Sequence, residues 1–392
     1  RLGQRHHQPD AKRDPHAPDV DPDEQHVKHD PPHRRRNARK HGLHVAGNEI
    51  HDHGRRKHVL DHIGHAAHKA AEWAERHGAG VPASRLITGT RDITLAVEEK
   101  LAAFKGCEAA LLFSCGFQAN ATVIPALAKV SASETALFSD ELNHASIIHG
   151  ATMAKAANSP LSVFRHNDLN HLEELLEKHS GRKLILTESV FSMDGDRADL
   201  PALVQLAERH GAALYVDEAH ASGVLGPGGR GLAADQGVDL VMGTLGKAFG
   251  AFGAYIAGSR ALIDYLTNRC SGFVYTTALP PPVLGAVDAS LELIPGMDAD
   301  RHRLTDNAKR LRQALAAAGL ATLGSTTQIV PAVIGSETAA LAAAERLEEA
   351  GILAVAIRPP TVAEGTSRLR FALGSHLSEK DMTRLLDAIK NL

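Results

Sequence analysis

The sequence predicts an α/β protein with a large, mostly parallel β-sheet and a smaller C-terminal α+β domain. Two short apolar runs, Leu214–Val216 and Leu240–Met242, have the composition of buried strands. Both runs lead into polar and glycine residues, as in α/β proteins whose ligand sites lie beyond the carboxyl ends of the strands. From about Ile294 onward, helical patterns alternate with short strands, which indicates a second and smaller domain.

Helices and strands alternate along the predicted large domain, residues 73–290. Apolar residues recur at helical spacing over 90–104 and predict an amphipathic helix there. The other helices of this part are expected over 66–77, 169–178 and 282–293, and the other strands over 109–114, 136–139 and 183–187. In the small domain, residues 291–392, the longest helices are expected over 301–318 and 337–350.

Residues 1–72 differ in composition from the rest of the chain. Histidine, arginine, aspartate and proline dominate them, and apolar periodicity is nearly missing, so the segment buries too little surface to offset its ordering entropy. A disordered tail or a shifted reading frame is expected. The functional alternatives are metal binding through the four histidines His51, His53, His58 and His62, or RNA binding through the basic run 34–40.

The strand ends carry residues that suit pyridoxal phosphate. This cofactor needs a lysine that forms a Schiff base and an acid that keeps the pyridine nitrogen protonated. Lys247 is the candidate lysine and Asp217 the candidate acid. His220 could reach the ring hydroxyl, and Thr244 could donate to the phosphate. Taken singly, each residue has a simpler explanation, such as a helix cap, a core histidine or a surface lysine, but the combination favours the cofactor.

Two strings of residues carry a resemblance to a known family. V-D-E-A-H-A-S-G-V-L-G at 216–226 and G-T-L-G-K-A-F-G at 243–250 resemble the α-oxoamine synthases, a branch of the fold type I pyridoxal phosphate enzymes. The resemblance runs from about Glu75 to the C-terminus and is greatest to the members that serve biotin biosynthesis. It implies a large mostly parallel-sheet domain and a smaller C-terminal domain.

The resemblance also implies roles for further residues. Cys115, Gly116 and Phe117 match the family's phosphate loop, and a glycine between a strand and a helix does let backbone N–H groups approach a phosphate. His144 is expected to lie flat on the pyridine ring, with an exposed helix cap as the alternative, and Ser192 to hydrogen-bond the cofactor. Thr277 is expected to reach the phosphate of a neighbouring subunit, which implies a homodimer. For the substrate, the resemblance implies that Arg370 grips the amino-acid carboxylate and that Thr361 touches the substrate.

The activity implied by the resemblance is a decarboxylative condensation. L-Alanine and a pimeloyl thioester, carried by CoA or by an acyl carrier protein, are the expected substrates. A glycine-using member, such as 2-amino-3-ketobutyrate CoA ligase or 5-aminolevulinate synthase, is the first alternative. The string I-R-P-P-T-V at 357–362 before G-T-S-R-L-R at 365–370 favours alanine, whereas Thr90–Asp92 resembles the ligase slightly more. A non-catalytic protein with a metal- or nucleic-acid-binding tail is the second alternative.

Composition limits the partners and the location. The formal net charge of −3 gives no electrostatic reason to expect nucleic acid or an anionic membrane. No apolar run reaches the roughly 20 residues that a membrane-spanning helix needs. The three cysteines, Cys107, Cys115 and Cys270, are scattered, so we expect neither disulfides nor a metal cage, and a reducing, cytoplasmic environment.

Overall fold

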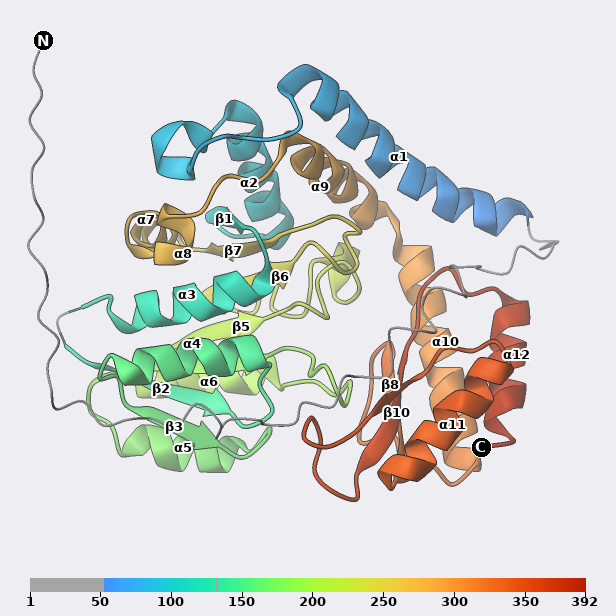
Figure 1. Cartoon of the computed structure of the whole chain (residues 1–392). Coiled ribbons are helices and arrows are strands. Elements are labelled where there is room, and N and C mark those ends of the chain that lie inside the picture. Colours follow the sequence, from blue (N-terminus) through green and yellow to red (C-terminus); the bar gives the residue numbers. More distant parts are fainter. Residues whose placement is uncertain (1–52, 132) are drawn as a thin grey trace, which may run out of the picture. The chain divides into compact units, whose positions relative to one another are not determined.

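The computed structural model describes residues 53–131 and 133–392, with side chains from Gly64 onward. Its main feature is a seven-stranded sheet with the order β1-β7-β6-β5-β4-β2-β3 (Figure 1). Its strands are β1 (Ala109–Phe113), β2 (Thr135–Asp140), β3 (Leu161–Phe164), β4 (Arg182–Glu188), β5 (Ala212–Asp217), β6 (Leu240–Thr244) and β7 (Ala254–Gly258). The five neighbouring strands β3, β2, β4, β5 and β6 are parallel. Strand β7 is antiparallel to both of its neighbours, β6 and β1. The predicted α/β class and mostly parallel sheet are therefore confirmed.

Side chains alternate across each strand, and those on both faces of this sheet are largely apolar. Helices therefore cover both faces. The helices are α2 (Asp92–Lys105), α3 (Gly116–Ala128), α4 (Ala145–Ala156), α5 (Leu169–Glu177), α6 (Leu200–His210), α7 (Arg260–Arg269), α8 (Ser271–Val274) and α9 (Pro281–Leu293). Helices α3, α4 and α7 pack on the face that carries Tyr215 and Met242. Helices α5 and α6 pack on the opposite face, against Val216 and Val241.

The parallel strands end in polar residues along one edge of the sheet. β5 ends at Asp217 and β6 at Thr244, while the adjacent β4 ends at Glu188, which pairs with Asp217 in the strand register. The backbone of Glu218 still bonds to Met242, so the two chains stay together as they leave the sheet. This edge is where the sequence predicted the ligand site.

The first described helix, α1 (His53–His77), lies alongside α9 (Figure 1). Lys69 pairs with Asp288 and Glu292 of α9, and a Cβ added to Gly285 would lie only 2.9 Å from the Trp73 ring. Close approach of the two helices therefore depends on a glycine. The predicted domain boundary at residue 72 falls inside α1, which begins earlier than the helix expected over 66–77. The proposed metal and RNA sites of the N-terminal segment lie outside the residues whose side chains are described.

The C-terminal part is a small α+β domain, as predicted. After a short turn at Ile294–Gly296 come α10 (Asp298–Ala317), β8 (Ile329–Gly335), α11 (Glu337–Glu349), β9 (Val355–Ile357), β10 (Ser367–Ala372) and α12 (Glu379–Ile389). The three strands form an antiparallel sheet with β10 in the centre. The three helices pack on that sheet around Leu311, Leu347 and Leu385.

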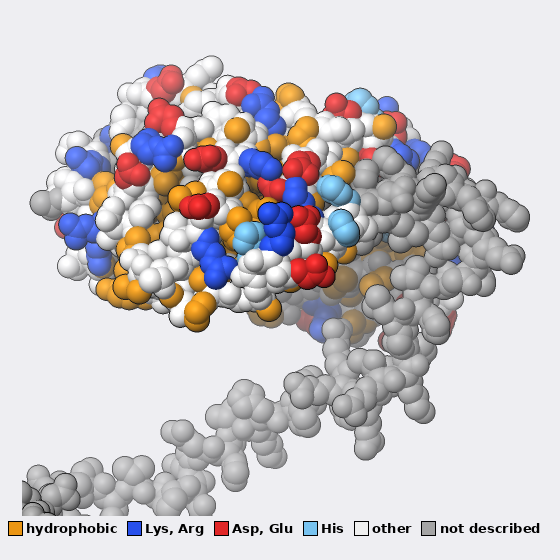
Figure 2. Space-filling model, turned by 90° about the horizontal axis from the view of Figure 1, so that it is seen from above, with side chains coloured by type: hydrophobic (Ala, Val, Ile, Leu, Met, Phe, Trp, Pro, Cys, Tyr) orange, Lys and Arg blue, Asp and Glu red, His pale blue; other side chains and the backbone are white. Residues whose placement is uncertain are grey.

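Surface charge of both signs is mixed on the face shown in Figure 2, where Lys and Arg side chains alternate with Asp and Glu. Among the described residues, that face therefore carries no broad basic area of the kind that binds nucleic acid. Within the described part of the chain, no helix combines the length and the apolar character needed to cross a membrane.

Candidate active site

Asp217 is a buried acid at the carboxyl edge of the large sheet. It is 3% exposed at the end of β5, and its carboxylate accepts hydrogen bonds from Nδ2 of Asn120 at 2.8 Å and from the backbone of Ala219 at 2.8 Å. Desolvation raises the pKa of Asp217, while these two donors and the charge of Lys247 oppose the rise. Because desolvation disfavours the charged form of this carboxylate, a cationic partner such as a protonated pyridine nitrogen would stabilise that form.

Asn120 connects Asp217 to His144. Its Nδ2 also lies 2.9 Å from Oγ of Ser146, and that hydroxyl lies 2.7 Å from Nδ1 of His144. His144 is exposed and caps α4 by accepting from the backbone of Ser146. The structure thus shows the helix-cap geometry considered for His144, and the same contacts fix the position of its ring near the edge of the sheet. Its stacking on a pyridine ring stays a prediction.

Lys247 and His220 face each other. Nζ of Lys247 lies 3.0 Å from Nε2 of His220. Although Lys247 opens onto a cavity, desolvation of its amine lowers its pKa, against the opposing charges of Asp217 and Glu188. The pKa of His220 falls to about 3, first through desolvation and then through the charge of Lys247. His220 is therefore neutral, and its Nε2 can accept from the lysine amine.

A cavity of about 640 Å³ brings Lys247 and His220 together with Arg370 of the small domain. Nε of Arg370 donates to the backbone carbonyl of Ser192 at 2.6 Å, which fixes one edge of the guanidinium. Its two terminal nitrogens have no hydrogen-bond partner among residues 64–131 and 133–392. Desolvation lowers the pKa of Arg370, but the guanidinium stays cationic because a free guanidinium loses its proton only far above neutral pH. The cavity thus contains a cation with free donors opposite an amine.

Glu188 is a candidate site residue that the sequence analysis did not include. It is 2% exposed, lies beside Asp217 in the strand register, and accepts from the backbone N–H of His144 at 2.6 Å. Desolvation, and next the neighbouring Asp217, raise its pKa well above the usual range. We therefore assign the proton of this acid pair to Glu188 and the charge to Asp217. Its signal in the sequence was a carboxylate at the end of a buried strand, the same signal that identified Asp217.

The residues of the predicted phosphate loop lie at the start of α3, and their role toward a phosphate stays a prediction. Cys115 caps this helix through Sγ, which accepts from the backbone of Gln118 at 3.4 Å, and Gly116 and Phe117 form its first turn. The N–H groups of that turn suit an anion. On β6, the hydroxyl of Thr244 donates to the Gly253 carbonyl at 3.3 Å, so the hydroxyl must turn to donate to a phosphate.

Of the predicted site residues, only Lys247, His220 and Arg370 are among the residues that line the cavity. Asp217, His144, Thr244 and the start of α3 lie outside that lining, and so do Thr277, Thr361 and Ser192. Thr277 is exposed and bridges to Ser84. Thr361 lies in an exposed turn, and Ser192 contacts Arg370 through its carbonyl rather than its side chain. The roles of Thr277, Thr361 and Ser192 toward a cofactor, a substrate or a second subunit stay predictions.

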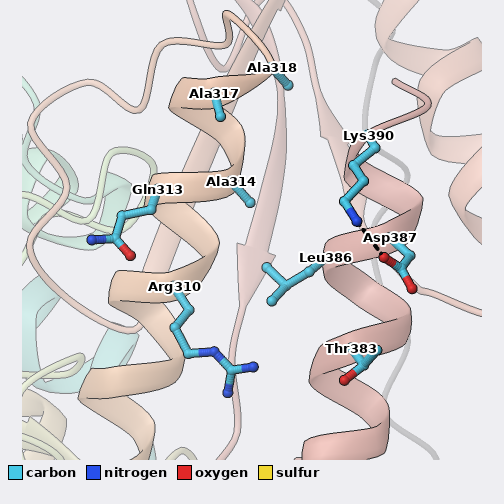
Figure 3. Close-up of a pocket in the computed structure, with 9 residues that line it drawn as sticks. All are labelled: Arg310, Gln313, Ala314, Ala317, Ala318, Thr383, Leu386, Asp387 and Lys390. Atoms are coloured by element: carbon cyan, nitrogen blue, oxygen red, sulfur yellow. Dashed lines mark hydrogen bonds and ion pairs between the residues drawn. The ribbon is translucent and has the colours of Figure 1, made fainter.

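A second cavity, of about 570 Å³, lies between α10 and α12 of the small domain (Figure 3). Its apolar lining consists of Ala314, Ala317, Ala318 and Leu386, and Gln313 and Thr383 add uncharged polar groups. The charged residues on its rim are already paired: Lys390 with Asp387 at 2.7 Å, and Arg310 with Glu379. Because these charged groups form exposed ion pairs, the Lys247 cavity is the candidate active site.

The residues present fit pyridoxal phosphate. Lys247 would bind its aldehyde, Asp217 its ring nitrogen, and the first turn of α3 its phosphate. The buried carboxylate of Asp217, the amine of Lys247 with its lowered pKa and the N-terminus of α3 come from three separate parts of this chain. Together with the sheet topology they define a fold type I enzyme.

Comparison with known proteins agrees with this class. The family model for aminotransferases of class I and II matches residues 43–389, which reaches further upstream than the resemblance near Glu75 suggested. The 8-amino-7-oxononanoate synthase of Gluconacetobacter diazotrophicus is 52% identical over 344 residues, covering 84% of this chain and 86% of the relative. The enzyme of the same name from Geobacter sulfurreducens is 48% identical over 333 residues, covering 82% and 83%.

Solved structures give the same result. A serine palmitoyltransferase from Sphingomonas wittichii superimposes with a TM-score of 0.78 at 29% identity, covering 83% of this chain and 82% of the other. A crystal structure of 8-amino-7-oxononanoate synthase from Francisella tularensis superimposes with a TM-score of 0.71 at 28% identity, covering 85% and 94%. The chain is thus a pyridoxal phosphate-dependent acyltransferase of the aminotransferase class I and II fold. It belongs to the 8-amino-7-oxononanoate synthase family.

Proposed function

We propose that this enzyme condenses L-alanine with a pimeloyl thioester and releases carbon dioxide and the thiol carrier, giving 8-amino-7-oxononanoate for biotin biosynthesis. A carbon–carbon bond forms between the α-carbon of alanine and the thioester carbonyl, the carbon–sulfur bond breaks, and the alanine carboxylate leaves as carbon dioxide. The observation that carries the proposal is the cavity that holds both Lys247 and Arg370. The names of the relatives support the product.

Arg370 is suited to bind the carboxylate of the amino acid. Nε is held by the carbonyl of Ser192, which leaves the two terminal nitrogens of the planar guanidinium to meet both oxygens of a carboxylate. Such a pair positions the α-carbon toward the amine on the other side of the cavity. Orientation of this kind supplies a large share of many enzymatic rate enhancements.

Lys247 is suited to move the α-proton. Bound pyridoxal phosphate supplies an electron sink for the charge that develops at the α-carbon. A general base works best when its pKa lies near the working pH, and desolvation moves the pKa of Lys247 in that direction. Neutral His220 accepts from Nζ and so orients the amine. Asp217 would hold the proton on the ring nitrogen through its negative charge.

Product analysis tests the proposal. Purified enzyme loaded with pyridoxal phosphate is incubated with pimeloyl-CoA, or with a pimeloyl carrier protein, and either L-alanine or glycine. We expect 8-amino-7-oxononanoate from alanine, with much less product from glycine. The matched control is Lys247→Ala, which should form no product. Condensation of glycine but not alanine would replace this proposal by the glycine-using alternative.

The partners remain part of the proposal. Thr277 is exposed at its bridge with Ser84, which is compatible with contact to a second copy. We propose a homodimer on this ground and on the family resemblance, and sedimentation equilibrium tests it. The choice between CoA and an acyl carrier protein, and the cytoplasmic location, also stay predictions.

A further inference from the structure

We propose that His166 is a positioning residue that holds two loops of the active site, and through them His144 and Arg370, in place. The inference rests on the function proposed for those two residues. His166 lies between β3 and α5, outside the Lys247 cavity. Neither the motifs of the sequence nor the residues that suit the cofactor include it.

Both ring nitrogens of His166 meet a carboxylate. Nδ1 lies 3.0 Å from Oδ1 of Asp140 and Nε2 lies 2.8 Å from Oδ2 of Asp196. The ring also packs edge-on against Phe191, with 4.3 Å between the ring centroids. Because a neutral imidazole has only one N–H, donation to both carboxylates requires the doubly protonated, cationic ring. The side chain therefore acts as a charged bridge between two separate segments.

The first segment leads to His144. Asp140 ends β2, and its carboxylate also accepts from the backbone of Leu142 at 2.8 Å and of Asn167 at 3.0 Å. The backbone N–H of His166 donates to Glu141 at 2.8 Å. These contacts fix the turn from Asp140 to His144.

The second segment leads to Arg370. Asp196 closes a tight loop in which the backbone of Phe191 donates to the Asp196 carbonyl at 3.1 Å. The same loop presents the Ser192 carbonyl that holds Nε of Arg370. A shift of the Asp196 side chain would therefore move the group that orients the guanidinium.

The loop that contains Asp196 packs closely on the small domain. Its Gly195 has a φ of +69°, and a Cβ there would lie 2.0 Å from the carbonyl oxygen of Ile329. Asn167 adds a neutral link beside the charged one, because its Nδ2 donates to Oδ2 of Asp196 at 2.9 Å while its backbone donates to Asp140. His166 supplies the cation of this junction and so offsets the charge of both carboxylates.

The charges around His166 favour its cationic form. Asp140, Glu141, Asp194 and Asp196 face it, whereas the nearby Arg165 and Arg368 are paired with Asp168 and Asp194. The side-chain bonds to Asp140 and Asp196 outweigh the desolvation of the ring and raise the pKa of His166 to about 10. The bridge is consequently intact throughout the neutral range.

His166→Gln is the first test, with His179→Gln as the matched control, because His179 also packs edge-on against a phenylalanine, Phe138, but contacts no carboxylate in the described structure. Affinities for pyridoxal phosphate and for L-alanine are measured by titration of the purified protein. We expect His166→Gln to weaken alanine binding about tenfold, as for a misplaced binding group, and cofactor binding to a smaller degree. His179→Gln should match the wild type in both.

Asp196→Ala and Asp196→Asn form the second test, which also serves if His166→Gln does not fold. Asp196→Ala removes the acceptor of both His166 and Asn167 on the side of Arg370, so alanine binding should weaken while cofactor affinity stays near that of the wild type. Asp196→Asn keeps a hydrogen-bond partner for Nε2 and should restore most of the lost alanine affinity. NMR titration of the His166 ring should show its pKa below about 10 in Asp196→Asn.

Two outcomes would overturn the proposal: unchanged alanine affinity in both His166→Gln and Asp196→Ala, or equal losses in Asp196→Ala and Asp196→Asn. These binding measurements do not depend on turnover. A wild-type enzyme that binds alanine but does not condense it would contradict the proposed function and leave the role of His166 standing.

Discussion

Nδ2 of Asn120, in α3, lies 2.8 Å from Oδ2 of Asp217 at the end of β5. The orientation of this amide is set from its other side, because the hydroxyl of Tyr215 donates to Oδ1 of Asn120 at 2.6 Å. Tyr215 is fully buried two residues before Asp217 on the same strand. Strand β5 therefore positions Asn120 through Tyr215. Asn120 in turn favours the charged form of Asp217, the last residue of the same strand.

Asn120→Ala should weaken binding of pyridoxal phosphate. Loss of the amide removes one of two hydrogen bonds to a buried carboxylate, and such bonds contribute about 1.5–3 kcal/mol when one partner is charged. Tenfold or weaker cofactor affinity is expected on titration of the protein without cofactor. Asn268→Ala, which removes an exposed asparagine of α7, is the control. Equal cofactor affinity in the two variants would contradict the role of Asn120.

Asp217→Asn should retain some bound cofactor but lose most turnover. The amide keeps the shape of the side chain but cannot supply the negative charge that holds a proton on the ring nitrogen. Asp239→Asn is the control, since Asp239 precedes β6 at the opposite end of the same strand pair and accepts only the backbone of Leu214 in the described structure. Turnover and cofactor content are measured together. Wild-type turnover in Asp217→Asn would remove the electron-sink argument.

The strands could be predicted from short apolar runs, and the main site residues from the polar residues at the carboxyl ends of those runs. Asp217 ends β5 and Lys247 follows the end of β6, and these two strands are adjacent and parallel. The fold class therefore places both residues beyond the same end of the sheet. Asn120 was missed for a physical reason, because its importance lies in a contact between α3 and β5 that no spacing along the chain indicates. Glu188 carried the same signal as Asp217, a carboxylate at the end of a buried strand, but only the strand register shows that the two acids are neighbours.

Other parts of the site could not be predicted because they depend on contacts made by loops. The sequence indicated His166 only as one of many histidines, since the two carboxylates that meet it come from distant segments. The start of α1 was placed too late because its upstream residues lack apolar periodicity. Where its side chains are described, α1 meets α9 through Trp73 and the ion pairs of Lys69. Thr361 lies in an exposed turn and Thr277 at an exposed bridge with Ser84, where motif position does not fix a contact to a ligand.

Stability of the protein without cofactor should fall as the pH rises from about 4.5. The folded-state pKa of Glu188 is raised well above its value in the unfolded chain, which is about 4.3. Between these two pKa values the folded state binds more protons than the unfolded state, so the free energy of unfolding decreases with pH, by up to about 1.4 kcal/mol per unit for one proton.

Glu188→Gln removes this titrating group and should flatten the decrease. Urea unfolding of both proteins at several pH values between 5 and 8 measures the effect. Glu174→Gln, an exposed change on α5, is the control and should follow the wild type. A variant whose stability falls as steeply as that of the wild type would show that Glu188 is ionised in the folded protein.

Arg370→Ala should weaken amino-acid binding and shift the pH dependence of the reaction. Loss of the guanidinium removes the bidentate partner of the substrate carboxylate, so KM for the amino acid should rise by about a hundredfold, equivalent to roughly 2.7 kcal/mol. The charge of Arg370 also lowers the pKa of Lys247, although desolvation contributes more. Without that charge the pKa of Lys247 rises, and the base form of the amine appears only at higher pH. The rising limb of turnover against pH, measured at saturating amino acid, should therefore move to higher pH.

Arg358→Ala is the matched control, because Arg358 lies just after β9 of the same small sheet and its Nη1 is 3.6 Å from Oε2 of Glu337, away from the cavity lining. Should Arg358→Ala raise KM as much as Arg370→Ala, the assignment of the carboxylate-binding arginine would be wrong.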